Sequence, residues 1–340
     1  MSAYTIIAGA GIESLAFSDT GIAPAPLAAH EIRLRVHAVS LNYRDLMVAN
    51  GSYPNSIKDP VVPTSDGAGE IIAVGSAVTR VKPGDRVITT FFPDWEDGEI
   101  NHDKTARTFG ADSSGLLNHE AVLNEGDVVI IPDGLDYAAA ATLSCAGLTA
   151  WTALFWEAKL QPGDSVLLLG TGGVSIAALQ IAKAAGLFSI VTSSSDAKLA
   201  RTKELGANAT INYRTTPNWQ AEVLRITEGR GVDLVLEVGG TDTLEQSVNS
   251  VRMGGSVAII GGVSGFEAPA PFFPLIMGKR KLLGIYVGPR KALEELVNFV
   301  DIHNIKPVVG HEFPFSQARE AYAFLEAGQH FGKVVINVSQ

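Results

Sequence analysis

The sequence predicts an α/β protein in which a β-rich domain accompanies a doubly wound parallel sheet. Its 340 residues are too many for one ordinary core and suit two domains. Residues 31–90 contain strand-like segments between Gly and Pro, whereas strand-like and helix-like segments alternate after Pro132. Such alternation is typical of βαβ units and a parallel sheet. An apolar strand that runs into a Gly-rich turn at residues 166–175 supports the same fold.

The first part of the chain is predicted to be mainly β. Residues 31–39 alternate apolar and polar side chains, as a half-buried strand does. Residues 67–74 and 85–90 are further strand candidates. Residues 92–117 are polar, rich in Asp and Gly, and show no clear period. We therefore expect a long surface loop there, and loops of that length are often functional.

The second part is predicted to alternate regularly. Small and apolar residues at helical spacing predict a helix over residues 137–156. The predicted strands that follow cover residues 165–169, 189–192, 210–211, 234–237 and 256–260. The predicted helices between them cover residues 173–185, 197–205, 219–227 and 244–251. The tail adds predicted helices at 291–303 and 316–327 and a final strand at 333–338.

Composition excludes several classes of function. The formal net charge is −10 and no cluster of Lys and Arg offsets it, so we expect neither a nucleic-acid nor an anionic-membrane partner. No apolar run approaches the roughly 20 residues of a spanning helix, and residues 1–15 lack the pattern of a secretory signal. Cys145 is the single cysteine, so no internal disulfide can form. Together these features predict a cytoplasmic protein.

The Gly-rich turn predicts a dinucleotide site. Gly170 permits the tight turn, and Gly172 lets the backbone approach a pyrophosphate. Backbone amides at the start of the following helix then face the anion. Ser175 occupies the third glycine position, where a small residue still permits close packing. The residues predicted to bind the cofactor here are Gly170, Thr171, Gly172, Gly173 and Val174. The alternative is an ordinary strand-to-helix turn.

The end of the next strand indicates which dinucleotide is bound. Sites for NAD usually carry Asp or Glu there to hold the ribose 2′-OH. Ser193 occupies that position here, followed by Ser194, and Lys198 can supply positive charge to a 2′-phosphate. Asp196 is interpreted as the N-cap of the following helix. The sequence therefore favours NADP(H), although plain turn chemistry would also explain the serines.

These segments resemble the medium-chain dehydrogenase/reductase superfamily. The resemblance rests on Gly-Ala-Gly-Glu at 67–70, Val-Lys-Pro-Gly-Asp-Arg-Val at 81–87, the nucleotide loop and Gly-Lys-Val-Val at 332–335. It implies a GroES-like catalytic domain formed by residues 1–146 and 288–340. It also implies a Rossmann NADP-binding domain formed by residues 147–287.

Many members of this superfamily use a catalytic zinc, but the ligand positions here differ. Asn42 stands where zinc alcohol dehydrogenases have a Cys, and Ser65-Asp66 stands where they have His-Glu. Cys145 alone matches a ligand, and three ligands drawn from Cys, His and Asp or Glu are usual. The stretch that would hold a structural zinc contains no cysteine. We therefore expect no metal.

Asn-Tyr-Arg-Asp at 42–45 resembles the zinc-free branches instead, which include quinone oxidoreductases and enoyl reductases. The resemblance makes Asn42 a candidate for holding a substrate carbonyl or a cofactor hydroxyl, the alternative being a satisfied turn amide. Asp45 is a catalytic candidate or the partner of Arg44 in a structural ion pair. Tyr53 is a candidate proton donor or a packed aromatic. Further cofactor contacts implied by the resemblance are Tyr213, Gly239, Gly262, Val263 and Lys333.

The leading hypothesis is a zinc-independent, NADPH-dependent oxidoreductase that transfers hydride to a quinone or an α,β-unsaturated carbonyl. A second is an alcohol dehydrogenase or carbonyl reductase of the same superfamily. A third is a cofactor-binding protein with a structural or sensing role. The expected partners are a small-molecule substrate and a second copy of the chain, because residues 282–287 form an apolar candidate edge strand of the kind that pairs in relatives.

Overall fold

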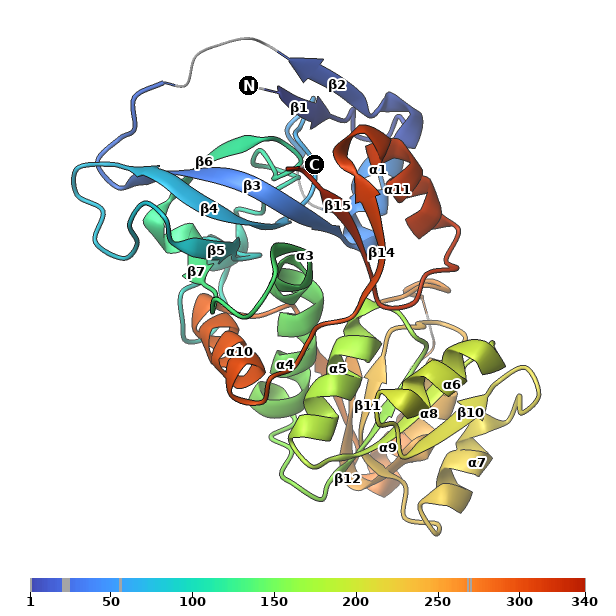
Figure 1. Cartoon of the computed structure of the whole chain (residues 1–340). Coiled ribbons are helices and arrows are strands. Elements are labelled where there is room, and N and C mark those ends of the chain that lie inside the picture. The colour runs from blue at the N-terminus through green and yellow to red at the C-terminus, as the bar shows by residue number, and fades with distance from the viewer. Residues whose placement is uncertain (1, 20–24, 55–56, 268, 270, 340) are drawn as a thin grey trace. The chain divides into compact units, whose positions relative to one another are not determined.

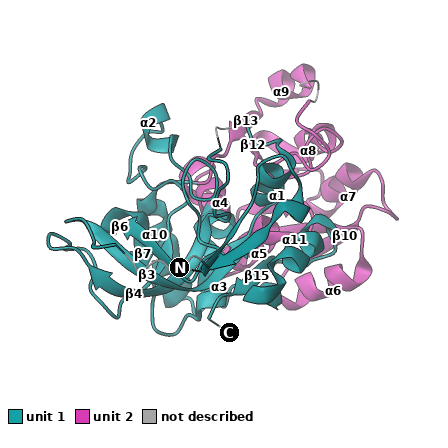
Figure 2. Cartoon of the chain, turned by 90° about the horizontal axis from the view of Figure 1, so that it is seen from above, with its two compact units in different colours: residues 1–148, 288–340 teal, residues 149–287 magenta. Residues whose placement is uncertain are grey.

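The computed structural model describes residues 2–19, 25–54, 57–267, 269 and 271–339. The chain divides into two compact units (Figure 2). One unit holds residues 1–148 and 288–340, and the other holds residues 149–287. The two ends of the chain therefore build one unit and its middle builds the other.

The first unit contains a seven-stranded sheet in the order β14-β15-β3-β4-β5-β7, with β6 paired to β3. The central strand β3 (Glu31–Leu41) pairs antiparallel with β4 (Asp66–Val74) and with β15 (Lys333–Asn337). In Figure 1 β15, at the red end of the chain, runs beside the blue β3. The register sets Val334 opposite Leu41 and so brings Lys333 next to the end of β3.

The other elements of this unit surround that sheet. The remaining strands are β5 (Arg86–Thr89), β6 (Glu120–Asn124), β7 (Val128–Ile130) and β14 (Val309–Pro314), with a separate pair β1 (Ser2–Thr5) and β2 (Ala16–Asp19). The helices are α1 (Tyr43–Asn50), α2 (His102–Thr105), α3 (Tyr137–Ala141), α10 (Arg290–Ile302) and α11 (Ala318–Glu326). The described residues of this unit also form the 3₁₀ turns η1 (Ile12–Ser14), η2 (Glu125–Asp127) and η5 (Phe315–Gln317). Inward-facing side chains of β3, among them Ile32, Leu34 and Val36, are fully buried in its core.

Residues 92–117 form a surface loop only in part, because residues 96–103 are exposed whereas the two ends of the segment are largely buried. The segment contains the short helix α2, and Phe92, Trp95, Phe109 and Leu116 are buried. These apolar side chains are spaced irregularly, so no strand or helix period revealed them. Their burial provides the favourable energy that ties an otherwise polar segment to the unit.

The helical stretch predicted for residues 137–156 is confirmed, but it is not a uniform α-helix. After α3 come the π-helical turn η3 (Leu143–Gly147), α4 (Leu148–Trp151) and a second π-helical turn η4 (Thr152–Glu157). Such wide turns are rare and occur often at functional sites. The first of them carries Cys145.

The second unit contains a six-stranded parallel sheet in the order β10-β9-β8-β11-β12-β13. Its strands are β8 (Ser165–Leu168), β9 (Phe188–Ser193), β10 (Ala209–Asn212), β11 (Val232–Glu237), β12 (Val251–Ile259) and β13 (Lys281–Gly284). The chain moves outward from β8 through β9 to β10 and then returns to the other side of β8 with β11. This reversal between β8 and β11 is the switch point at which doubly wound sheets bind ligands, beyond the carboxyl ends of the strands.

Helices connect the parallel strands, as the alternating pattern predicts. They are α5 (Gly173–Ala184), α6 (Asp196–Glu204), α7 (Trp219–Ile226), α8 (Leu244–Ser250) and α9 (Phe272–Gly278). The predicted elements of this part are all present, and β12 begins earlier than expected. Within the described part of the chain, none of the helices has the length and apolar character that crossing a membrane requires.

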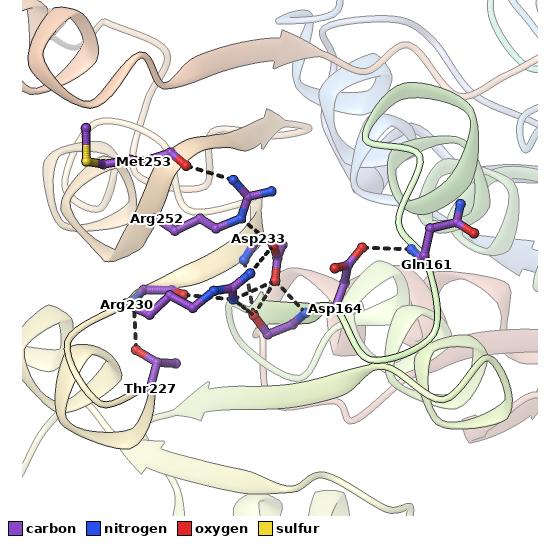
Figure 3. A network of polar contacts seen from close by, with 9 residues as sticks. Gln161, Asp164, Thr227, Arg230, Asp233, Arg252 and Met253 are labelled. Carbon is purple, nitrogen blue, oxygen red and sulfur yellow. Dashed lines mark hydrogen bonds and ion pairs between the residues drawn. The ribbon is translucent and has the colours of Figure 1, made fainter.

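A network of hydrogen bonds and ion pairs links the amino end of β8 to the amino end of β11, at the opposite end of these strands from the switch point (Figure 3). The buried Asp233 accepts hydrogen bonds from the backbone and hydroxyl of Ser165, at 2.9 and 2.8 Å. Arg230 contacts the same carboxylate at 2.8 Å, and Arg252 contacts it as well. These partners hold the pKa of Asp233 well below its usual range despite burial, so the carboxylate stays charged.

Candidate functional site

The turn after β8 has the geometry of an anion-binding loop. Gly170 has a φ of 72°, in the left-handed region that favours glycine. Gly172 is the N-cap of α5 and makes no side-chain capping bond. A Cβ at Gly170 or Gly172 would meet nothing within 4 Å, so the space beside both residues is open. Ser175 donates to Leu169 O at 2.7 Å and ties the helix to the strand. The loop therefore fits a pyrophosphate against the start of α5.

The other predicted cofactor residues of this unit follow the carboxyl ends of neighbouring strands. Ser193 ends β9, Gly239 follows β11, and Gly262 with the exposed Val263 follows β12. Because the strands are parallel, these ends lie on the same edge of the sheet as Gly170. These residues are far apart in the sequence, but the fold places them together at the carboxyl end of the parallel sheet.

The end of β9 shows turn chemistry around Ser193. Ser193 is buried, and its hydroxyl accepts from Ser195 N at 3.3 Å. A hydroxyl that accepts a hydrogen bond still carries its own hydrogen to donate. Tyr213 donates its backbone N–H to Ser193 O and has an exposed side chain, so it lies beside this strand end.

The N-cap of α6 is Ser195 and not Asp196, which corrects the interpretation from sequence. The Ser195 hydroxyl accepts from Lys198 N at 3.4 Å. Asp196 is the first helical residue and accepts from Asn212 Nδ2 at 2.7 Å. Arg214, exposed directly after Tyr213, is a further cation at this end of the sheet that the sequence reasoning did not single out.

The turn after β11 is fixed by a buried carboxylate. Glu237 is 1% exposed and accepts from Gly239 N, Gly240 N and the Thr243 hydroxyl at 2.7, 3.0 and 2.6 Å. These two amides are therefore occupied inside the protein. A contact between Gly239 and an adenosine would use the face of the glycine and not its N–H.

In the other unit, Asn42, Asp66 and Lys333 come together. Lys333 Nζ donates to Leu41 O and to Asn42 Oδ1 and lies 3.9 Å from Asp66 Oδ2. All three side chains are buried. Burial raises the pKa of Asp66, and Lys333, Asn42 and Ser65 partly offset that effect.

Asp45 supports the start of α1. One carboxylate oxygen accepts from Asn42 N at 2.7 Å, and the other lies 3.8 Å from Arg44 Nη1. Burial raises the pKa of Asp45 to about 6, although Arg44 lowers it. Arg44 also donates to Phe109 O at 2.6 Å and stands over the ring of the half-buried Tyr53, 4.6 Å from its centroid. These contacts match the predicted ion pair and place Tyr53 beside it.

Cys145 lies in the same electrostatic neighbourhood. Burial raises the pKa of its thiol, and the charge of Asp66 raises it further. Among the residues that the structure describes, no group of three His, Cys, Asp or Glu side chains is arranged to hold a metal ion.

Comparisons with known proteins agree with this architecture. Residues 28–133 match the family model of the alcohol dehydrogenase GroES-like domain, and residues 173–301 match that of the zinc-binding dehydrogenases. A zinc-type alcohol dehydrogenase-like protein of Schizosaccharomyces pombe is 41% identical over 322 residues, covering 93% of each chain. The chain belongs to the medium-chain dehydrogenase/reductase superfamily. The GroES-like and Rossmann folds expected from its motifs are thereby confirmed.

Two further relatives show the range of this superfamily. A quinone oxidoreductase of Pseudomonas aeruginosa is 30% identical over 344 residues, covering 96% of each chain. The crystal structure of an NAD-dependent alcohol dehydrogenase is 34% identical and superposes with a TM-score of 0.90, covering 100% of both chains. As a medium-chain dehydrogenase/reductase, the chain is an oxidoreductase that uses a nicotinamide cofactor.

Proposed function

We propose that this medium-chain dehydrogenase/reductase reduces a quinone or an α,β-unsaturated carbonyl compound with NADPH and without zinc. The observation that carries the proposal is the Lys333 ammonium at the would-be zinc ligands, where it donates to Asn42 Oδ1 and lies 3.9 Å from Asp66 Oδ2. Asn42 is the proposed donor to the substrate, because an amide NH₂ is a neutral donor suited to a carbonyl oxygen that gains negative charge.

The chemistry of the acceptor follows from what this donor can do. The bound dinucleotide supplies the hydride. Reduction of a simple ketone concentrates the developing charge on one oxygen, which zinc stabilises in alcohol dehydrogenases. A quinone or enone spreads that charge into a hydroquinone or enolate, so a few hydrogen bonds are enough. Asn42 supplies one of them, and we assign the proton to Tyr53 or solvent.

Zinc independence is supported by the charges already present at the would-be ligand positions. The Lys333 ammonium stands against Asn42 Oδ1 and near Asp66 Oδ2, which are the oxygen atoms that a metal there would need. A cation placed beside it would be repelled. Cys145 is the one thiol at these positions, and a catalytic zinc usually has three protein ligands.

The preference for NADPH is supported by the end of β9. Ser193 and Ser194 replace the usual acidic residue. Positive charge is available from Lys198, which follows shortly in the sequence, and from Arg214, which follows Tyr213, whose backbone N–H donates to Ser193 O. Asp196 is held by Asn212, so its carboxylate already has a partner.

The function is tested by a screen of NADPH oxidation over quinones, enones, simple ketones and aldehydes, with and without a chelator. We expect turnover of quinones or enones far above that of simple carbonyls, unchanged in chelator, and no stoichiometric zinc in the purified protein. One zinc per chain whose removal abolishes activity would contradict the proposal.

An alcohol dehydrogenase or carbonyl reductase is the second candidate, favoured by the resemblance to the NAD-dependent alcohol dehydrogenase. Ready oxidation of simple alcohols, with no turnover of enones and quinones, would establish it. Tight cofactor binding without turnover of any acceptor would favour a structural or sensing role.

Asn42 itself gives the sharpest single-residue prediction. Asn42→Ala should lower kcat about a hundred- to a thousandfold, because one oxyanion donor is lost. Asn42 is the N-cap of α1 in a capping box with Asp45, and its side chain accepts from the buried Lys333 ammonium, so the variant should also lose some stability. We expect NADPH affinity to stay near the parent value, with kcat taken per folded molecule. A lower melting temperature with unchanged kcat would instead mark a structural amide.

A further inference from the structure

One peptide group at the start of the Gly-rich loop is held at both of its polar atoms. It is the peptide between Leu169 and Gly170, directly after β8. Its carbonyl oxygen, Leu169 O, accepts from the Ser175 hydroxyl at 2.7 Å. Its N–H, on Gly170, donates to Thr192 Oγ1 at 3.3 Å. Ser175 belongs to the first turn of α5 and Thr192 to β9, so two different elements hold the same peptide.

Both hydroxyls are fixed by the fold of the second unit. Ser175 and Thr192 are each 2% exposed. The parallel pairing of β8 with β9 sets Leu168 opposite Val191 and so brings Thr192 to the level of Leu169. Hydrogen bonds in such a buried, low-dielectric place are stronger than in water. The two contacts therefore restrain the peptide firmly.

The orientation of this peptide determines the path of the loop. A peptide group is planar, so its orientation is set by two backbone rotations, ψ of Leu169 and φ of Gly170. Gly170 has a φ of 72°, and glycine adopts many other values at little cost. The glycine permits the turn but does not select it. The two hydroxyls select it, and with it the approach of the chain to Gly172 at the start of α5.

Neutral hydroxyls suit a peptide that lies beside an anion site. The turn after β11 is held differently, because the carboxylate of Glu237 accepts from the backbone N–H groups there. A carboxylate in the place of Ser175 or Thr192 would repel a pyrophosphate at the start of α5. The hydroxyls restrain the peptide without adding negative charge.

We propose that Ser175 and Thr192 are positioning residues that hold the Leu169–Gly170 peptide and so set the loop for the cofactor pyrophosphate before the cofactor binds. Ser175 then has a task of its own at the position of the third glycine. A loop that is already ordered loses less conformational freedom on binding, which strengthens the complex. The inference rests on the use of a nicotinamide cofactor and holds whichever acceptor the enzyme reduces.

The first test changes the hydroxyl of Thr192 without changing its shape. Thr192→Val should raise the dissociation constants for NADPH and NADH about fivefold or more, because one hydrogen bond to the loop is lost. Thr192→Ser keeps the hydroxyl and should stay within about twofold of the parent. Both cofactors carry the same pyrophosphate, so the ratio of their dissociation constants should not change. Fluorescence titration without an acceptor measures all of these values.

The second test asks whether the two hydroxyls act on one peptide. Ser175→Ala should also raise both dissociation constants about fivefold or more. A peptide already released by one substitution has less to lose from the other. The factor for the variant with Thr192→Val and Ser175→Ala together should therefore be smaller than the product of the two single factors. A factor equal to that product or larger would overturn the joint action.

Thr202→Val and Ser250→Ala are the matched controls. Each removes a buried hydroxyl of the same unit that bonds within its own helix, to Leu199 O at 2.7 Å in α6 or to Gln246 O at 2.8 Å in α8. Their melting temperatures without cofactor should fall as much as those of the loop variants. Their dissociation constants should stay within about twofold of the parent, because the loop is untouched.

Three outcomes would overturn the inference. One is cofactor affinity near the parent value in both Thr192→Val and Ser175→Ala. Another is an equal loss of affinity in the controls, which would trace the effect to stability in general. The third is an equal loss in Thr192→Ser, which would show that the shape of the side chain matters and its hydroxyl does not. None of them bears on the acceptor, so the proposed function is tested separately.

Discussion

At the scale of single residues, Ser193 is where the choice of cofactor is decided. A carboxylate at this strand end would accept a hydrogen bond from a ribose 2′-OH and repel a 2′-phosphate. We therefore expect the parent to bind NADPH more tightly than NADH and Ser193→Asp to shift the preference towards NADH by about tenfold or more. Fluorescence titration with both cofactors measures this. Equal affinities in the parent protein would contradict the assignment.

Single residues also show how far sequence reasoning reaches. The roles of Gly170 and Gly172 follow from local spacing, because the turn they form is local. The contact between Lys333 and Asn42 depends on the pairing of β15 with β3, which lie far apart in the sequence. A local sequence pattern therefore does not predict it. The capping error has a similar cause: Ser195 and Asp196 are both good N-caps, and only the backbone conformation distinguishes them.

At the scale of elements, the parallel sheet was predictable because each βαβ unit repeats the same two periods. The buried ends of residues 92–117 were not predictable, because their buried side chains follow no period and depend on the surrounding unit. The π-helical turn around Cys145 could not be predicted from the sequence either. The extra residue in such a turn changes the backbone hydrogen bonds, but the spacing of apolar residues still looks helical.

The loop between β8 and α5 yields a prediction that separates binding from folding. Gly172 has a φ of −79°, which any residue adopts, and open space where a Cβ would stand. Gly172→Ala should therefore keep or slightly raise stability, by up to about 1 kcal/mol. The added methyl fills the space left for the pyrophosphate, so the dissociation constant for NADPH should rise at least tenfold. Parent affinity in this variant, by calorimetry, would argue against the loop as the phosphate site.

The network at the amino ends of β8 and β11 makes stability depend on pH. The pKa of Asp233 is lowered on folding, so its contribution is present above its unfolded value near 4 and is lost as pH falls below it. Asp233→Asn should lower the free energy of unfolding by about 1–3 kcal/mol near neutral pH and by less at about pH 3. Urea unfolding at both pH values measures the difference.

The control for this prediction is Glu222→Gln, which breaks the exposed pair between Glu222 and Arg225. A surface pair of this kind contributes little, so its loss should cost less than about 1 kcal/mol. A cost for Asp233→Asn that is the same at both pH values would show that packing, and not charge, is what the network provides.

At the scale of the whole molecule, the second unit presents an apolar surface next to an open sheet edge. β13 is the last strand of the sheet, and Leu282 and Tyr286 in or beside it are exposed. On the preceding α9, Phe272, Phe273 and Ile276 are 72%, 74% and 75% exposed. Large exposed apolar side chains in one segment mark association surfaces, and an unpaired edge invites pairing with another strand.

We therefore predict a homodimer formed through β13 and α9, since a two-fold axis lets the same edge and helix cover each other. Light scattering at micromolar concentration should give twice the chain mass of 35.8 kDa. Phe273→Glu with Ile276→Glu should yield monomers, because two charges would have to be buried in the interface. The control Ile302→Glu alters an apolar residue of similar exposure, 65%, on α10 of the other unit and should leave the dimer intact. A parent protein that is monomeric at this concentration would refute the pairing and leave the apolar surface of α9 to a different partner.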